Sequence, residues 1–230
     1  ICFALWLMLF RPISIILLFS RRDDEACKLK ERLKNVYERL PKFLRAASVL
    51  RDGAHELTLS NGSSAMAFPT TAGDSYTGDL ALVDEADLAP DLGRLMRAVK
   101  PTIDGGGRMI LLSRADKTQP QSMFKRIYLA AKRGANGWTP IFLPWSACPH
   151  RTPAWYEEKK QEVLSRTGAL DELHEQYPTV DVDALAPAEK DKRLPGKWLL
   201  DRFREIEPLA DDVSVPAVPG LSVYVKPRAG

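Results

Sequence analysis

Two adjacent acids, Asp84 and Glu85, follow directly on the apolar run Leu80–Val83. Such a run is typical of a strand that is buried on both faces, and its end brings the acids to the edge of a sheet. In nucleotide hydrolases with this arrangement, the first acid orients the Mg²⁺ shell that bridges two phosphates, and the second polarises the attacking water. The alternative is a strand that leaves the core into an ordinary polar loop.

A hydroxyl and two charged side chains, Ser113, Arg114 and Asp116, follow the next apolar run, Met109–Leu112. In a sheet of this kind the two runs are expected to be neighbours, which places Ser113 beside the acids. A hydroxyl there can hydrogen-bond the γ-phosphate or the attacking water and so report hydrolysis to the rest of the protein. Arg114 and Asp116 are close enough in sequence to assist. An ordinary strand-end serine and two solvated charges are the alternative.

The elements that must position these residues alternate between strand-length apolar runs and stretches with helical spacing. This alternation predicts right-handed βαβ units, and therefore an α/β fold with a mainly parallel sheet flanked by helices. Asn61-Gly62 predicts a hairpin turn. The expected strands are Ile13–Phe19, His55–Leu59, Ser64–Phe68, Leu80–Val83, Met109–Leu112 and Ile141–Leu143, and the expected helices are Ile1–Phe10, Ala26–Leu40, Pro90–Val99, Met123–Ala131 and Thr152–Arg166.

Beyond Arg166 the pattern changes to short pieces that prolines separate. We expect residues 1–150 to form the α/β core, residues 151–209 a small helical subdomain, and residues 210–230 a linker with the first strand of something further on. The pieces expected in the last two regions are helices at Asp171–Gln176, Asp183–Ala186 and Trp198–Ile206, and a strand at Leu221–Val225.

Composition limits the possibilities only broadly. A hydrophobic content of 45% is enough for a packed core and excludes overall disorder, and a net charge of +3 permits contact with nucleic acid without requiring it. The cysteines and histidines are widely spaced and suggest neither a disulfide framework nor a zinc site. The apolar opening could be taken for a membrane span, but Arg11-Pro12 interrupts it, which favours a buried helix followed by a strand.

A phosphate-binding loop of the form GxxxxGK[ST] is absent from the sequence. The glycines 105–107 lack the lysine and hydroxyl residue that hold phosphates and metal. Such a loop normally stands between a first strand and a first helix, and Ile1–Phe10 has the character of the buried end of that helix. We therefore expect the loop to lie just before Ile1, which fits a sequence that starts with Ile rather than Met.

The order of these pieces resembles the ATPase domain of the large terminase subunit, the genome-packaging motor of tailed bacteriophages. The resemblance covers nearly the whole chain, and the acid pair is its most specific motif. The matching segments are Leu9–Pro12 leading into Ile15–Ala26, Ser75–Asp79 before Leu80–Glu85, Ile110–Ser113, Pro144-Trp145, Pro153–Trp155, Glu175–Pro178 and Leu221–Val225.

The resemblance implies a RecA-like, additional-glutamate P-loop ATPase core, of which residues 1–150 are part. It implies that Asp84 coordinates Mg²⁺, that Glu85 is the catalytic base, and that Ser113 belongs to the coupling motif. The cofactors would be ATP and Mg²⁺. The partners would be double-stranded DNA, a portal protein, a small terminase subunit and further copies in a ring, with no membrane. The location would be the cytoplasm of the bacterial host, for a phage- or prophage-encoded protein.

The sequence departs from the family pattern at two positions. Asp74 stands in the Gly-x-Ser-Tyr stretch where many relatives have an arginine, and an acid cannot stabilise transition-state charge as a guanidinium does. Arg114 is bulkier than the small residues usual in the coupling motif. The family's nuclease domain would begin just after Gly230, so no nuclease residues are assigned.

Two alternatives remain open at the level of sequence. Val83–Asp87 contains the acidic box of one helicase group, although Asp171–Gly230 is too short and too broken by prolines for a second RecA-like domain. The chain could also be a non-catalytic remnant. The missing phosphate-loop strand would lie between Met109–Leu112 and Ile141–Leu143, and its loss exposes backbone edges. We therefore expect the isolated 230-residue chain to be weakly stable and not to hydrolyse ATP.

Overall fold

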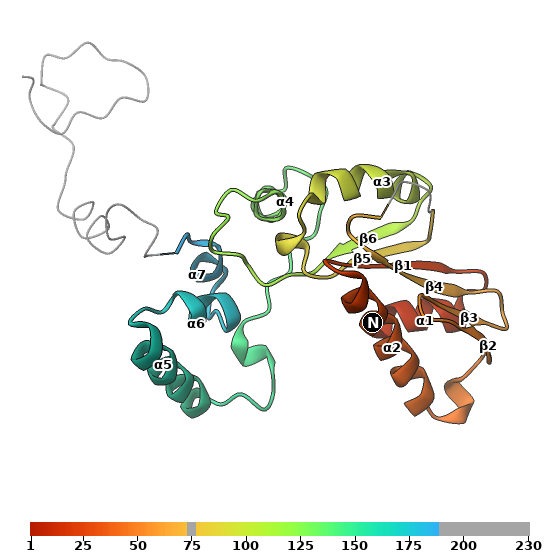
Figure 1. Cartoon of the computed structure of the whole chain (residues 1–230), viewed down its shortest axis with the longest axis horizontal. Coiled ribbons are helices and arrows are strands. Elements are labelled where there is room, and N and C mark those ends of the chain that lie inside the picture. Colours follow the sequence, from red (N-terminus) through yellow and green to blue (C-terminus); the bar gives the residue numbers. More distant parts are fainter. Residues whose placement is uncertain (73–76, 189–230) are drawn as a thin grey trace, which may run out of the picture. The chain divides into compact units, whose positions relative to one another are not determined.

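A six-stranded sheet forms the centre of the computed structural model, which describes residues 1–72 and 77–188. Along the sheet the strand order is β2-β3-β4-β1-β5-β6 (Figure 1). Strands β4, β1, β5 and β6 run parallel to one another, and β2 and β3 extend the sheet with antiparallel pairing. The bounds are β1 Ile15–Ser20, β2 Val49–Asp52, β3 Glu56–Leu59, β4 Ser64–Pro69, β5 Leu80–Val83 and β6 Arg108–Leu111.

The predicted α/β fold with a mainly parallel sheet is confirmed. Strand β5 has the bounds expected from its apolar run, and all of its residues are buried. It pairs with β1 on one side and with β6 on the other, so its backbone groups are satisfied within the sheet. The end of β5 is therefore held from both sides.

Helices cover both faces of the sheet, because successive residues of a strand point to opposite sides. Ile16 and Leu18 of β1 pack with α1 and α2, whereas Leu17 and Phe19 pack with α3 and the start of α4. The helices of the described residues are α1 Cys2–Phe10, α2 Asp23–Arg39, α3 Leu92–Asp104, α4 Met123–Lys132, α5 Pro153–Thr167, α6 Asp171–Gln176 and α7 Asp181–Leu185.

Local signals in the sequence place several element ends correctly. The predicted Asn61-Gly62 hairpin joins β3 to β4, and Gly62 adopts the positive φ of 83° that such turns require. The Thr152 side chain accepts a hydrogen bond from the Trp155 backbone N–H and caps α5, as expected. Helix α1 ends at Phe10, before Arg11-Pro12.

Among the described residues, none of the helices has the length and apolar character needed to span a membrane.

Two expectations are wrong. Ile141–Leu143 is not a strand: Ile141 and Leu143 are 74% and 72% exposed, because prolines flank the segment and no described strand pairs with it. Apolar character alone does not form a strand without a partner. Cys27 and His55, expected to be isolated, lie close to each other beside Asp23.

Some elements differ from the prediction or fall outside the described residues. Strand β2 was not expected, because all of its residues are exposed and show no alternation of polar and apolar side chains. The helix predicted at Asp183–Ala186 is α7, which begins two residues earlier. Asp74, Trp198–Ile206 and Leu221–Val225 lie outside the described residues. Contacts divide the chain into Ile1–Ala186, which holds every element named here, and Pro187–Gly230.

Candidate functional site

The acid pair lies at the carboxyl end of β5, where hydrogen bonds continue beyond the strand. The Asp84 N–H donates to the Phe19 carbonyl oxygen of β1 at 2.8 Å. On the other side, the Ala86 N–H donates to the Leu112 carbonyl oxygen at 2.9 Å. The backbone around the acid pair is thus fixed by both neighbouring strands, and the Asp84 and Glu85 side chains are half-buried.

Glu85 has a left-handed backbone conformation, with φ of 52° and ψ of 41°. For a residue other than glycine this conformation costs about 1–2 kcal/mol. The Glu85 N–H donates to Oδ1 of Asp84 at 3.1 Å, and the short 3₁₀ helix η2, Ala86–Leu88, begins directly afterwards. Backbone strain that the surrounding structure maintains is found especially at functional positions. Here the strained conformation determines the direction in which the Glu85 side chain leaves the backbone.

Ser113 lies within one hydrogen bond of the acid-pair segment. Its Oγ accepts a hydrogen bond from the Asp87 N–H at 3.1 Å, and the side chain is half-buried. Strands β5 and β6 are neighbours, as the sequence predicts. A hydroxyl that accepts one hydrogen bond still has its proton to donate. The structure therefore brings Ser113 next to the acids and leaves it able to donate to a bound group.

Asp87 is the main residue of this region that the sequence did not reveal as important. Its carboxylate is fully buried, lies 3.4 Å from Nζ of the equally buried Lys125, and accepts hydrogen bonds from the Asp116 N–H, at 2.7 Å, and the Ser122 hydroxyl. Burying a charge is costly unless it is paired and hydrogen-bonded. Asp87 therefore fixes the end of β5 to the loop after β6 and to α4. In the sequence it stood out only as the last acid of the Val83–Asp87 box, which gives it no structural role.

Arg114 and Asp116 have partners away from the acid pair. Arg114 forms an ion pair with Glu175 of α6. Burial opposes ionisation of Asp116, but hydrogen bonds from Thr118 and Gln119 outweigh this effect and lower the pKa of the carboxyl group. Arg114 thus connects the loop after β6 to α6, and Asp116 accepts hydrogen bonds within that loop.

The same loop is attached to α7. Lys117 is buried, and its Nζ donates to the Asp183 carbonyl oxygen at 2.6 Å and to the Ala186 carbonyl oxygen at 3.0 Å. These carbonyls belong to the carboxyl end of α7, where a cation is favoured. The loop after β6 is thus in direct contact with both α6 and α7.

A cation lies on the other side of the acid pair, after β1. The Arg22 Nε donates to Glu25 Oε1 at 3.0 Å, and this hydrogen bond raises the pKa of the Arg22 guanidinium. The negative charge of Glu85 acts in the same direction, so Arg22 lies within electrostatic reach of the second acid. Arg22 belongs to no motif in the sequence, because only the pairing of β1 with β5 brings it near Glu85.

The site fits Mg²⁺ by the chemistry of its donors. Mg²⁺ prefers oxygen ligands and is usually held by one or two carboxylates together with phosphates and water. Among the residues that the structure describes, only the Glu85 backbone N–H donates to the Asp84 carboxylate, at Oδ1, which leaves Oδ2 for an ion. The chain itself supplies no phosphate-binding loop at this edge.

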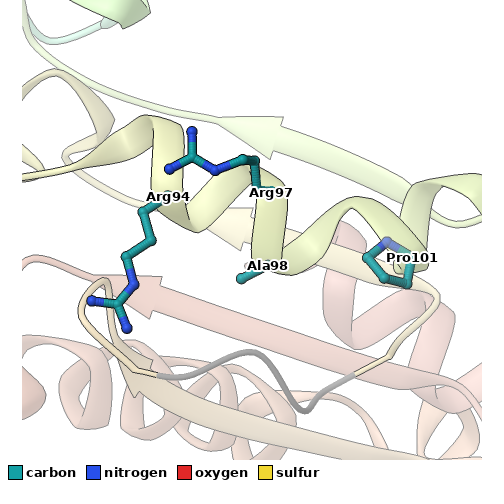
Figure 2. Close-up of a pocket in the computed structure, with 4 residues that line it drawn as sticks. All are labelled: Arg94, Arg97, Ala98 and Pro101. Atoms are coloured by element: carbon teal, nitrogen blue, oxygen red, sulfur yellow. The ribbon is translucent and has the colours of Figure 1, made fainter.

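A hollow on α3 is separate from the acid pair. Arg94, Arg97, Ala98 and Pro101 line it (Figure 2). Figure 2 shows the two arginine side chains leaving the helix in different directions. They do not form one convergent anion-binding fork, so the acid pair remains the better candidate for a chemical site.

Two solved structures of phage large terminases are similar to this fold. The large terminase ATPase domain of Thermus phage P74-26 superposes with a TM-score of 0.58 and 19% identity, over 76% of this chain and 80% of the other. The large terminase of a second thermophilic bacteriophage gives a TM-score of 0.54 and 14% identity, over 69% of this chain and 40% of the other. The described fold is that of a large terminase ATPase domain.

At these identities the likeness to the terminases concerns the fold and not individual residues. The sequence itself matches no protein-family model and none of the curated proteins compared with it. The chain spans less than half the length of the second of these large terminases. The terminase fold nevertheless provides the central parallel strands at whose edge Asp84, Glu85 and Ser113 meet.

Proposed function

We propose that this chain is the ATPase region of a terminase large subunit, the motor that uses ATP to package double-stranded DNA into phage capsids. The observation that carries the proposal is the acid pair at the end of the central parallel strand β5. Backbone hydrogen bonds to both neighbouring strands fix the segment that carries the acids, and Glu85 has a left-handed backbone conformation. The fold around them is similar to that of a terminase ATPase domain.

Asp84 and Glu85 have different roles in the proposed reaction. Asp84 holds Mg²⁺ through its carboxylate, and the ion, when bound, neutralises charge on the phosphates of ATP. Glu85 accepts the proton of the attacking water, because its backbone is fixed and its carboxylate has no described hydrogen-bond partner competing for it. Ser113 senses the γ-phosphate through its hydroxyl and passes its position to the loop after β6.

The remaining parts of the motor are supplied from outside the described residues. A phosphate-binding loop must cradle ATP, since this sequence contains none. We propose as partners double-stranded DNA, a portal protein, a small terminase subunit and further copies of the subunit in a ring, in the cytoplasm of a bacterial host. Asp84, Glu85 and Ser113 form the metal and water side of the site.

The test is Glu85→Gln in the full-length protein. The amide keeps the shape of the side chain but cannot accept the proton, so the turnover of ATP falls by at least about 100-fold while ATP binding is retained. The matched control is Glu158→Gln on the exposed surface of α5, which leaves turnover unchanged.

Three results would contradict the proposal. Turnover at the wild-type rate in Glu85→Gln would remove Glu85 as the base. A wild-type full-length protein without ATPase activity, despite a folded circular dichroism spectrum, would favour the non-catalytic remnant. DNA-stimulated turnover without packaging into capsids would favour a helicase-type motor.

A further inference from the structure

Asp23, Cys27 and His55 come together where α2 begins. Asp23 and Cys27 are four residues apart on α2 and so share one face of the helix. His55 comes from the turn before β3, and its Nε2 lies 2.9 Å from Oδ2 and 3.1 Å from Oδ1 of Asp23. One carboxylate oxygen, the Cys27 sulfur and one imidazole nitrogen all lie within 4.8 Å of one another.

The three donor types match one class of metal ion. Thiolate, imidazole and carboxylate are all common zinc ligands, whereas Mg²⁺ and Ca²⁺ prefer oxygen donors alone. Around a tetrahedral ion with bonds of about 2.0–2.3 Å, ligand atoms lie about 3.3–3.8 Å apart. The His55–Asp23 distance of 2.9 Å therefore has to widen by a few tenths of an ångström, and a distance to the Cys27 sulfur at the 4.8 Å limit has to shorten by about 1.2 Å. The side chains of His55 and Asp23 are 54% and 56% exposed, so they have room to adjust.

The electrostatic surroundings of Cys27 favour a cation. Burial raises the pKa of the Cys27 thiol, and the negative charges of Asp23, Asp24 and Glu31 raise it further, against the opposing charge of Lys30. A divalent ion reverses this balance, because it binds the thiolate directly and offsets the neighbouring carboxylates.

We propose that Asp23, Cys27 and His55 form a binding site for a divalent transition-metal ion of the zinc class, with water in the remaining position. The site joins the start of α2 to the turn before β3, two segments that lie 32 residues apart in sequence. Its ligand set is distinct from the oxygen donors at Asp84, so it does not depend on the proposed ATPase chemistry.

Cobalt is the probe that tests the site. Co²⁺ bound to a thiolate produces a charge-transfer absorption in the near ultraviolet, and we expect this band to saturate at one ion per chain in the reduced, chelator-treated full-length protein. Zn²⁺ displaces Co²⁺ and abolishes the band. Cys27→Ser removes the band and weakens Co²⁺ binding by at least about 100-fold. This loss is larger than the typical effect of removing a residue that only hydrogen-bonds to a metal ligand.

Matched variants separate this site from others. Cys148→Ser removes another half-buried cysteine and leaves the band intact. Asp84→Asn also leaves it intact, whereas His55→Ala weakens binding without unfolding the protein, because His55 is exposed. Absence of the band in the wild-type protein would overturn the proposal, as would a band of unchanged intensity in Cys27→Ser with a native circular dichroism spectrum.

Discussion

At the scale of single residues, the acid pair depends on a neighbour that makes no proposed contact with ATP. Asp87 is buried together with Lys125, and its hydrogen bonds reach the Asp116 N–H and the Ser122 hydroxyl. Its own N–H donates to Ser113. A buried ion pair adds little net stability by itself, but removing one partner leaves the other charge uncompensated. Asp87 therefore determines the positions of Ser113 and of the segment that carries Glu85.

Asp87→Asn tests this dependence. We expect the free energy of unfolding to fall by about 3–5 kcal/mol, because the Lys125 ammonium stays buried without a counter-charge. Urea denaturation measures the change. The control is Asp104→Asn, whose exposed pair with Lys100 is worth at most about 1 kcal/mol. Asp87→Leu combined with Lys125→Met removes both buried charges and should recover part of the loss, although the Asp116 N–H and the Ser122 hydroxyl lose their acceptor. Equal losses for Asp87→Asn and Asp104→Asn would contradict the buried-charge explanation.

At the scale of elements, the loop from Ser113 to Ser122 connects the strand ends with the small helices. Arg114 contacts Glu175 of α6, and Lys117 contacts the carboxyl end of α7. These contacts make the loop the described connection between Ser113 and the helices α6 and α7. We propose that a change at Ser113 reaches the two helices through it.

Lys117→Met tests the attachment to α7. The methionine fills a similar volume but cannot donate to the Asp183 and Ala186 carbonyls, and an unsatisfied buried acceptor costs about 1–3 kcal/mol. We expect faster hydrogen exchange of the α7 amides, with β5 amides unchanged, by mass spectrometry. Lys28→Met serves as the control, since Lys28 is exposed and pairs only locally with Asp24. Uniform acceleration across α7 and β5 would indicate global destabilisation instead.

At the scale of the whole described chain, α4 and α7 are joined by a polar contact. The Tyr128 hydroxyl donates to Oδ2 of Asp181 at 2.9 Å, and the Lys132 ammonium lies 2.6 Å from the same oxygen. Burial and the Asp181 carboxylate raise the pKa of Tyr128 from 10.0 to about 12. The folded protein therefore keeps Tyr128 neutral at a pH where the unfolded chain ionises it.

This shift predicts a loss of stability in alkali. The pKa of Tyr128 is higher in the folded protein than in the unfolded chain. Its contribution to the free energy of unfolding is therefore fully present below about pH 10 and is lost as the pH rises towards 12. Urea midpoints measured across this interval should fall more steeply for the wild-type protein than for Tyr128→Phe, which has no phenol to ionise. Identical pH profiles for the two proteins would show that Tyr128 does not contribute.

The sequence by itself determined the features that depend only on residues close together in the chain. The apolar run Leu80–Val83 is buried on both faces, so its length and composition were enough to place Asp84 and Glu85 at a sheet edge. Turn and capping residues, such as Asn61-Gly62 and Thr152, act on their immediate neighbours and were equally readable. The order of these pieces was enough to predict the terminase ATPase fold.

Only the tertiary structure decided the features that depend on distant partners. Ile141–Leu143 has the composition of a strand, but strand formation requires a neighbouring edge, and no described strand provides one. Asp87 is buried with several polar partners only because α4 and its N-cap bring Lys125 and Ser122 next to it. Cys27 and His55 meet because α2 and the turn before β3 pack together. Composition and spacing cannot specify such contacts, because they form between segments far apart in the chain.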